Sequence, residues 1–450
     1  MPRNTYHIHW PNRINWPLSA RSNAAPSSGQ WSPGSRGFSV ALRPVTLTLD
    51  QILCLVCLSL LGIGLVMVHS ANARISDFSR HWFIHFFISG AALHMLLAVL
   101  AMCLVWRFDY RRLIGRSLPL SAVTFLLIAA LLLLALVLTH LGTSINGARR
   151  WLLLRIGSHA ISFEPSELAK WSLVLFISAY AMHREDKIRD FLRGFLPLTA
   201  IIGITCVLIL KEDFGTAALI AGVSAILMLM AGCRWWHLAI LVPGVLVLGY
   251  FAVWHIPYRR ERLLIFLHPH LDPRGAGYNP IPSLLSFSSG GFWGRGLGNG
   301  IQKLGYLPEA NTDFIFSLIA EELGFFGCMV VVSLYLVLTI CGWRIVCRTR
   351  DLFGKMAGFG CTAMISLQAA MNIAVATVSV PTKGIALPLI SSGGTSWILT
   401  AAAIGLLMSI ERTTRMEMTN RLPAATGQAD RLLKLPAAAA NDSVAMRTVA

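Results

Sequence analysis

The sequence predicts an all-α, polytopic membrane protein with ten transmembrane helices. Only 13% of the 450 residues are charged and 55% are hydrophobic, whereas a soluble domain carries about 25% charged residues. The charges stand between long runs rich in Leu and Ala, such as 126–138. Unbroken runs of this kind are typical of membrane helices and exclude barrel strands, which alternate in polarity. They also exclude a soluble enzyme, a disordered protein and a nucleic-acid partner, which requires a solvated cationic face.

Ten runs come close to the length of about 20 apolar residues that crosses the hydrocarbon core. We expect helices at 48–69, 84–106, 118–140, 166–182, 195–210, 214–232, 236–255, 313–341, 356–380 and 388–410. Only Lys211 to Gly215 separate the fifth run from the sixth. These two runs therefore also fit a single membrane segment with a break in its middle.

The placement of Lys and Arg predicts that both termini are cytoplasmic. With this orientation the inner segments hold 24 of the 38 Lys and Arg residues, where they face anionic inner-leaflet lipid. The membrane domain is expected at 48–412, between a flexible basic arm at 1–47 and a flexible tail at 413–450. The polar start of the chain shows no cleavable signal peptide.

A loop of about 57 residues, 256–312, is expected on the outer face. Loops of this length are usually functional. Its glycines at 290–298 would let backbone N–H groups approach an anion closely. A merely flexible extracellular loop is the alternative.

The loop ends at Asp313, where the eighth run begins. Thr312 or Asp313 also fits a plain helix N-cap. Glu309 stands four residues earlier, and Glu321 and Glu322 follow within the run. Because carboxylates inside a membrane are costly, this cluster favours a functional role.

Other outer helix ends also carry charges. Arg149 precedes the fourth run, and Glu167 and Lys170 stand three residues apart near its start, on one helix face. A Glu–Lys pair that only fixes packing is the alternative for these two. Asp213 and Lys383 mark two further outer ends. Arg150, Arg295 and Lys303 are further cations expected on the outer face. Carboxylates can act as a base or hold a divalent metal, and cations bind phosphate, which suits an anionic, lipid-linked substrate.

At these residues the chain resembles the SEDS family (shape, elongation, division and sporulation), which includes the bacterial FtsW and RodA proteins. The resemblance covers roughly 48–412, with its motifs in family order. The motifs are Gly147 to Trp151, Pro165 to Glu167 with Lys170, Asp213 to Thr216, Gly277 with Tyr278, Gly294 to Gly298, Gln302 to Leu304, Leu307 to Glu309, Thr312 to Phe316, Glu321 to Gly324 and Gly384 to Ser396.

The resemblance implies a ten-span bundle and a peptidoglycan glycosyltransferase that polymerises lipid II at the outer face of the bacterial cytoplasmic membrane. It implies a class B penicillin-binding protein as partner, with other divisome proteins at the septum. The essential outer-loop aspartate of the family matches Asp313. Lys383, in the segment Pro381 to Gly384, and the long N-terminal arm resemble the division branch, FtsW, rather than the elongation branch, RodA.

Five positions depart from the family pattern. They are Glu164 for Gln, Pro282 for Gln, Gly305 for an acidic residue, Asn311 for His and Ser392 for Tyr. Asp313 and Lys383 are unaffected, and no catalytic role is assigned to positions 305 and 311.

In the implied reaction, the donor sugar is α-linked to a pyrophosphate, and the product glycan is β-1,4-linked. The configuration of the anomeric carbon is therefore inverted in a single displacement. We expect Asp313 to deprotonate the acceptor hydroxyl. Cations would stabilise the leaving undecaprenyl pyrophosphate. The predicted substrate-binding residues are Lys383, Arg149, Lys170, Glu167, Arg295, Glu309 and Lys303. A divalent cation, Mg²⁺ or Mn²⁺, is a further expectation, without assigned protein ligands.

Three other functions fit parts of this pattern. A lipid II flippase or transporter also uses a helix bundle with intramembrane charges. A RodA-type elongation polymerase shares the motifs. A scaffold would only recruit and activate the partner. The ionisable groups cluster at the outer helix ends, which favours a polymerase over a transporter.

Overall fold

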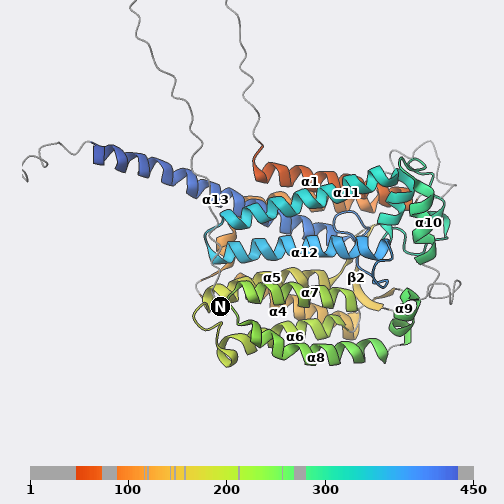
Figure 1. Ribbon diagram of the computed structural model, residues 1–450, viewed down its shortest axis with the longest axis horizontal. Helices are drawn as coiled ribbons and strands as arrows, with labels where there is room; N and C mark the ends of the chain where they lie inside the picture. The colour runs from red at the N-terminus through yellow and green to blue at the C-terminus, as the bar shows by residue number, and fades with distance from the viewer. Residues whose placement is uncertain are drawn as a thin grey trace, which may run out of the picture. The chain divides into compact units, whose positions relative to one another are not determined.

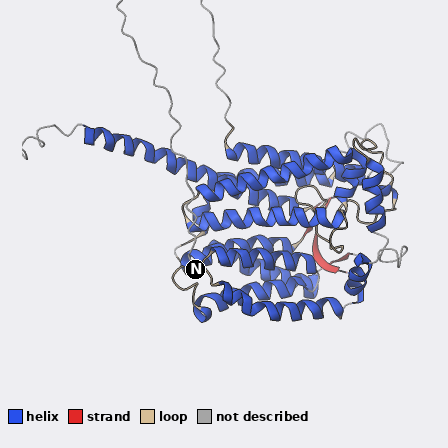
Figure 2. Ribbon diagram, viewed as in Figure 1, coloured by secondary structure: helices blue, strands red, loops and turns tan. Residues whose placement is uncertain are grey.

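Figure 1 shows the computed structural model of the protein, and Figure 2 colours it by secondary structure. The structure describes residues 47–72, 89–115, 117–118, 121–141, 143–145, 148–156, 159–210, 213–255, 257–267 and 280–433. Most of the predicted arm, the end of the predicted tail and the Gly277–Tyr278 motif lie outside these residues.

Long helices dominate the described chain (Figure 2). They are α1 (Leu49–Asn72), α3 (Gly90–Arg107), α4 (Ala122–Leu136), α5 (Pro165–His183), α6 (Leu196–Leu210), α7 (Phe214–Met230), α8 (Trp235–Trp254), α11 (Ile315–Arg348), α12 (Leu352–Ala376) and α13 (Thr395–Leu433). Each of the ten predicted runs is occupied by one of these helices. The fifth and sixth runs form two separate helices, α6 and α7.

Within the described residues, seven helices are long and apolar enough to cross a membrane. They are α1, α3, α4 with the π-helical turn Val137–Leu141, α6 with the preceding π-helical turn Phe191–Phe195, α8, α11 and α12. Helix α7 is apolar but shorter. The structure therefore confirms an all-α polytopic membrane protein, while the count of ten spans stays a prediction.

Two parts of the chain differ in secondary structure from the expectation. A small antiparallel sheet, β1 (Thr143–Ile145), β2 (Ala148–Ile156) and β3 (His159–Phe163), lies between α4 and α5. Helix α13 continues to Leu433, so the segment predicted as a tail begins as helix.

The long outer loop also has secondary structure of its own. It contains α9 (Pro257–Leu267), α10 (Pro280–Gly290) and a 3₁₀ turn, η7 (Gln302–Leu304). In Figure 1, α9 and α10 lie beyond one end of the long helices. That end also holds the outer loops predicted from the Lys and Arg distribution.

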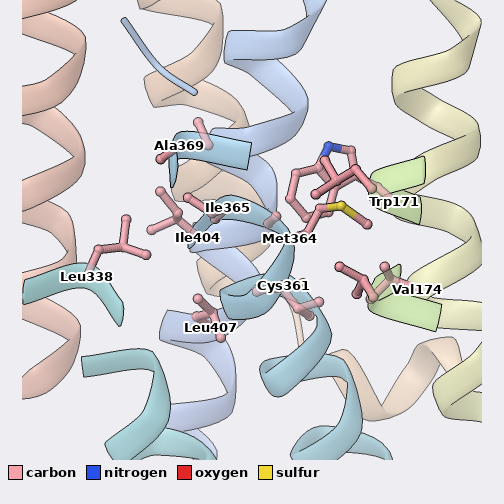
Figure 3. Packing of buried hydrophobic residues seen from close by; sticks show 14 of the residues in the cluster. Trp171, Val174, Leu338, Cys361, Met364, Ile365, Ala369, Ile404 and Leu407 are labelled. Carbon is pink, nitrogen blue, oxygen red and sulfur yellow. The ribbon is translucent and has the colours of Figure 1, made fainter. Parts of the chain in front are cut away.

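The core of the bundle lies among α5, α11, α12 and α13 (Figure 3). Met364 and Cys361 of α12 lie near Trp171 and Val174 of α5 in this view. A Cβ added at Gly360 of α12 would lie 2.5 Å from Val174, so glycine allows the close approach of the two helices. By contrast, none of the residues of α8 is buried, as expected for a helix surrounded by lipid.

Two ion pairs and a hydrogen bond join helices at the opposite, cytoplasmic end of the bundle. Arg415 of α13 pairs with the buried Asp50 of α1 at 3.2 Å. Tyr110, in the 3₁₀ turn η2 (Tyr110–Leu113) after α3, donates to Asp351 before α12 at 2.7 Å. Arg111 pairs with Glu417 of α13. These contacts hold α1, α12 and α13 together where the topology rule places the cytoplasm.

Helix α11 consists of two segments that meet at Gly324, whose φ of 70° and ψ of −166° are not helical. After Gly324, α11 runs antiparallel to α12, because Gly342 lies against Thr362 and Val346 against Gly358.

Before Gly324, the chain runs parallel to α12, because residue numbers rise together in the two contacting segments. Asn372 Nδ2 donates to the carbonyl of Asp313 at 2.9 Å. Four residues further on, Ser317 Oγ and the carbonyl of Ala376 both bond to Ser283 Oγ, at 2.7 and 2.6 Å. The chain therefore reverses direction relative to α12 at Gly324. This reversal brings Asp313 back beside α12.

Gly324 is a position where this fold should not tolerate an added methyl group. We expect Gly324→Ala to destabilise the protein by about 1–3 kcal/mol, because of its positive φ and because the Cβ would lie 2.3 Å from the Gly294 nitrogen. Thermal unfolding in detergent micelles measures this. Gly222→Ala in α7, where nothing lies within 4 Å of the Cβ, is the control and should not lower the midpoint. Equal midpoints for the two variants would contradict the reversal at Gly324.

Candidate active site at the outer end of the bundle

Asp313 lies half-buried immediately before α11. The predicted N-cap role of Thr312 or Asp313 is wrong, because the N-cap residue of α11 is Phe314, which makes no side-chain cap bond. The backbone of Asp313 is instead held from two sides. Its carbonyl accepts from Asn372, and its N–H donates to the Glu309 carbonyl at 3.1 Å.

The residues before Asp313 are tied to the segment that precedes α13. Ser391 Oγ donates to the Thr312 carbonyl at 2.5 Å, and the Ser392 N–H donates to the Asn311 carbonyl at 2.9 Å. Groups held in this way keep a reactive side chain in one position.

Two other elements that carry cations lie near the Asp313 carboxylate. A Cβ added at Gly384 would be 3.4 Å from Asp313 Oδ2, so the segment that carries Lys383 borders the carboxylate. Arg262 of α9 interacts electrostatically with Asp313 and Asp213 and donates from Nη1 to the Thr382 carbonyl at 3.2 Å. The site thus combines a carboxylate with two cations.

Asp213 and Phe214 connect these cations to α7. Asp213 caps α7, because its Oδ1 accepts from the Thr216 N–H at 3.0 Å. The Phe214 ring centroid lies 5.2 Å from Lys383 Nζ and 5.8 Å from Arg259 Cζ, so both cations contact its π-system. The result is a junction of α7, α9 and the segment before α13.

Burial lowers the pKa of Lys383 below its usual 10.5, and Asp213 partly opposes the shift. Burial also lowers the pKa of Arg262, against the opposing charges of Asp313 and Asp213. Partly desolvated cations of this kind interact more strongly with an anion than exposed ones do.

Arg262 and Arg259 were missed by the sequence analysis. Loop cations of a long loop carry little weight in the topology rule. The available signal was the clustering of Arg259, Arg260 and Arg262 before the apolar residues that end α9.

Two predicted substrate-binding residues, Glu167 and Lys170, form a buried ion pair. Lys170 is fully buried, and its Nζ donates to both Glu167 carboxylate oxygens at 2.8 Å and to Gln368 Oε1 at 2.9 Å. Ser396 Oγ donates to Glu167 at 3.3 Å. The pair therefore joins α5, α12 and α13, and substrate contact by either residue stays a prediction.

Lys303 takes part in a second buried network, with Glu322. Glu322 is completely buried. It accepts from Lys303 Nζ and Ser70 Oγ at 2.7 Å, and from the N–H groups of Gly298 and Gly300 at 3.0 and 3.3 Å. The glycine-rich segment does bring N–H groups to an anion, and this anion is a carboxylate of the protein.

Glu321 holds the other side of the same segment. It is also completely buried, and it accepts from the N–H groups of Ile301 and Gln302 at 2.9 and 3.2 Å. Arg295 Nη1 lies 4.0 Å from its carboxylate, and the Arg295 side chain is 38% exposed. The structure thus places Arg295 and Lys303 beside the carboxylates of α11.

The two remaining predicted residues are Glu309 and Arg149. The exposed Glu309 has a φ of 54° and accepts from Thr312 Oγ1 at 2.8 Å. Arg149 belongs to β2, and its side chain lies outside the described part of the structure, as does that of Arg150.

The described residues fit a protein-bound metal poorly. Among them, no three His, Cys, Asp or Glu side chains gather closely enough to hold an ion. The divalent cation stays a prediction from the sequence, and no chemical step is derived through it.

The family model described as "Cell cycle protein", which covers FtsW, RodA and SpoVE, matches residues 51–416. A protein of Aliivibrio salmonicida is 38% identical over 83% of this chain and 92% of its own length, and one of Geobacter metallireducens is 35% identical over 82% and 96%. Both are described as "Probable peptidoglycan glycosyltransferase FtsW".

Two solved structures resemble the fold. One comes from work on "polymerization and crosslinking by a peptidoglycan synthase complex", with a TM-score of 0.63, 28% identity, and coverage of 80% of this chain and 97% of that chain. The other is the rod shape determining protein RodA of Thermus thermophilus, with a TM-score of 0.56, 26% identity, and coverage of 80% and 95%.

The network of Glu322 predicts a stability effect that can be measured. Glu322→Gln leaves the Lys303 ammonium buried without its counter-charge, so we expect a loss of about 3–5 kcal/mol. The double variant Glu322→Gln/Lys303→Met removes the stranded charge and should recover part of this loss. Thermal unfolding in micelles compares the two proteins, and a double variant less stable than the single one would argue against the pairing.

Proposed function

Since the chain belongs to the FtsW, RodA and SpoVE family of cell cycle proteins, we propose that it is an FtsW-type peptidoglycan glycosyltransferase that polymerises lipid II. The observation that carries this proposal is the position of Asp313. The carboxylate lies at the outer end of a membrane bundle, bordered by the Lys383 segment and by Arg262. This combination suits transfer of a sugar from a lipid-linked pyrophosphate.

The reaction needs a base at the acceptor. The acceptor 4-hydroxyl oxygen attacks the anomeric carbon of the donor, the new C–O bond forms, and the bond to pyrophosphate breaks with inversion. Asp313 accepts the hydroxyl proton in this step. Its backbone is fixed by Asn372 and Glu309, which limits the loss of orientation between base and hydroxyl.

The leaving undecaprenyl pyrophosphate gains negative charge in the transition state. Two half-buried cations stabilise this charge: Lys383, whose neighbour Gly384 borders Asp313, and Arg262, which interacts electrostatically with Asp313. Arg262 supplies a planar fork for phosphate oxygens, whereas Lys383 acts as a point charge. Arg149 would add to this set, as the sequence analysis expects.

The partner and the place of action complete the proposal. The chain acts at the outer face of the bacterial cytoplasmic membrane, at the division septum, with a class B penicillin-binding protein and other divisome proteins. The likeness to a chain of a peptidoglycan synthase complex supports a transpeptidase partner. Dependence on Mg²⁺ or Mn²⁺ remains part of the proposal, and comparing activity with and without a chelator tests it.

Asp313→Ala is the direct test of the proposed function. The purified chain with its cognate transpeptidase, whose crosslinking is blocked by a β-lactam, receives labelled lipid II. We expect glycan polymer from the wild type and none from the variant, because the acceptor hydroxyl has lost its base. Gly222→Ala serves as the matched control and should polymerise normally. Full polymerisation by Asp313→Ala would overturn the assignment, and lipid II flipping without polymer would favour a transporter.

The lowered pKa of Lys383 predicts how the polymerisation rate changes at alkaline pH. Only the protonated ammonium stabilises pyrophosphate, and burial lowers its pKa below 10.5. The polymerisation rate should therefore fall, as pH rises, before an ordinary lysine would deprotonate. Lys383→Arg should keep its charge and move this fall to higher pH. Superimposable alkaline limbs for the two proteins would remove Lys383 from the pyrophosphate role.

A further inference from the structure

Asn372 of α12 joins the two segments that carry the base and a cation of the proposed reaction. Its Nδ2 donates to the Asp313 carbonyl at 2.9 Å and to the Ile385 carbonyl at 2.7 Å. Carbonyl oxygens only accept hydrogen bonds, so the amide nitrogen rather than the amide oxygen must face them. The Ile385 N–H in turn donates to the Lys383 carbonyl at 2.9 Å. One nitrogen atom therefore connects the backbone of Asp313 to the segment that begins at Lys383.

The surroundings of Asn372 favour a role in positioning over a role in stability. Its side chain is completely buried, so it does not touch the substrate. Its Oδ1 has no hydrogen-bond partner within the described part of the chain. The free-energy cost of burying an unpartnered acceptor is of the same order as the gain from two hydrogen bonds. The net contribution of Asn372 to folding is therefore small, whereas its two bonds define how two segments of the site lie relative to each other.

Gln368, one turn earlier on the same face of α12, holds the next carbonyl of the segment. Its Nε2 donates to the Ala386 carbonyl at 3.0 Å, and its Oε1 accepts from Lys170 Nζ at 2.9 Å. The Lys170 ammonium can only donate, so it fixes the orientation of the Gln368 amide. The buried pair of Glu167 and Lys170 thus acts on the Lys383 segment through Gln368.

The segment held by these two amides borders the Asp313 carboxylate. A Cβ added at Gly384 would lie 3.4 Å from Asp313 Oδ2. The Ile385 side chain is buried against α7, where a Cβ added at Gly215 would lie 2.9 Å from it. Because Lys383 stands only two residues before Ile385, a shift of the Ile385 carbonyl would also move Lys383 relative to Asp313.

We propose that Asn372 is a positioning residue that sets the placement of the Lys383 segment relative to Asp313, with Gln368 as the second attachment of that segment. This role rests on the proposed function. In that reaction Asp313 takes the proton of the acceptor hydroxyl while the pyrophosphate leaves towards Lys383, so both side chains must be in place in one transition state. A misplacement of about 1 Å can lower a rate by about 10²-fold.

The kinetics of Asn372→Leu test the proposal, because leucine branches at the same atom and donates no hydrogen bond. The full chain with its cognate transpeptidase, whose crosslinking is blocked by a β-lactam, receives labelled lipid II. The turnover is divided by the number of chains that bind lipid II, so an unfolded fraction does not lower it. We expect kcat per binding-competent chain to fall about 10–100-fold, while KM stays within about twofold of the wild type.

Ser366→Ala is the matched control on α12. Ser366 Oγ lies 2.7 Å from Thr339 Oγ1, so this variant removes a hydrogen bond from α12 to α11 rather than to the Lys383 segment. Its kcat should equal that of the wild type. Gln368→Met removes the bond to the Ala386 carbonyl and should lower kcat in the same manner, and it decides the matter if Asn372→Leu does not fold. Wild-type kcat in the deciding variant would overturn the proposal.

Amide hydrogen exchange separates this proposal from the proposed function, because it needs no turnover. The N–H groups of Ile385, Leu387 and Ser391 are hydrogen-bonded within the segment. Their exchange should be faster in Asn372→Leu than in the wild type or in Ser366→Ala.

Unchanged exchange in Asn372→Leu would overturn the positioning role, while polymer from the wild type and none from Asp313→Ala would still support the proposed function. Absence of polymer from the wild type would instead overturn the proposed function and, with it, the role of Asn372 in that reaction.

Discussion

The fold of the site depends on two carboxylates that are completely buried where α11 changes direction. Glu321 and Glu322 could not remain charged there without partners, since an unpaired buried charge costs several kcal/mol. The glycine-rich segment supplies backbone N–H groups, and Lys303 and Ser70 supply the rest. Satisfying these carboxylates holds the outer loop against α1 and α11. The reversal at Gly324 then sets the position of Asp313 beside α12.

The candidate site draws its charges from separate parts of the chain. Asp313 precedes α11, Arg262 belongs to α9, and Lys383 precedes α13. Asp213 and the Phe214 ring hold the cations where they are partly desolvated. A polymerase needs charges of both signs within one site, because it must remove a proton from the acceptor sugar and stabilise the pyrophosphate that leaves the donor sugar. This requirement explains why residues far apart in the sequence converge here.

Hydropathy and charge placement predicted the helical membrane class, and the motif pattern predicted Asp313 and Lys383 as site residues. Other features depend on contacts that no local pattern contains. The break at Gly324 lies within the single run predicted at 313–341, so periodicity alone predicts one helix. The partners of Lys170 and Lys303 include Gln368 and Ser70, which are distant in the chain. The sheet between α4 and α5 was missed because short apolar runs do not distinguish strands from helices.

The most direct measurement compares lipid II binding with lipid II turnover in the Asp313→Asn protein. Asparagine keeps the size of the side chain but cannot accept the proton as a carboxylate does. If Asp313 is the base, binding should stay within about twofold of the wild type while turnover falls by about 10²–10⁴-fold, the range of general-base catalysis. Unchanged turnover, or a loss of binding as large as the loss of turnover, would contradict the assignment of Asp313 as the base.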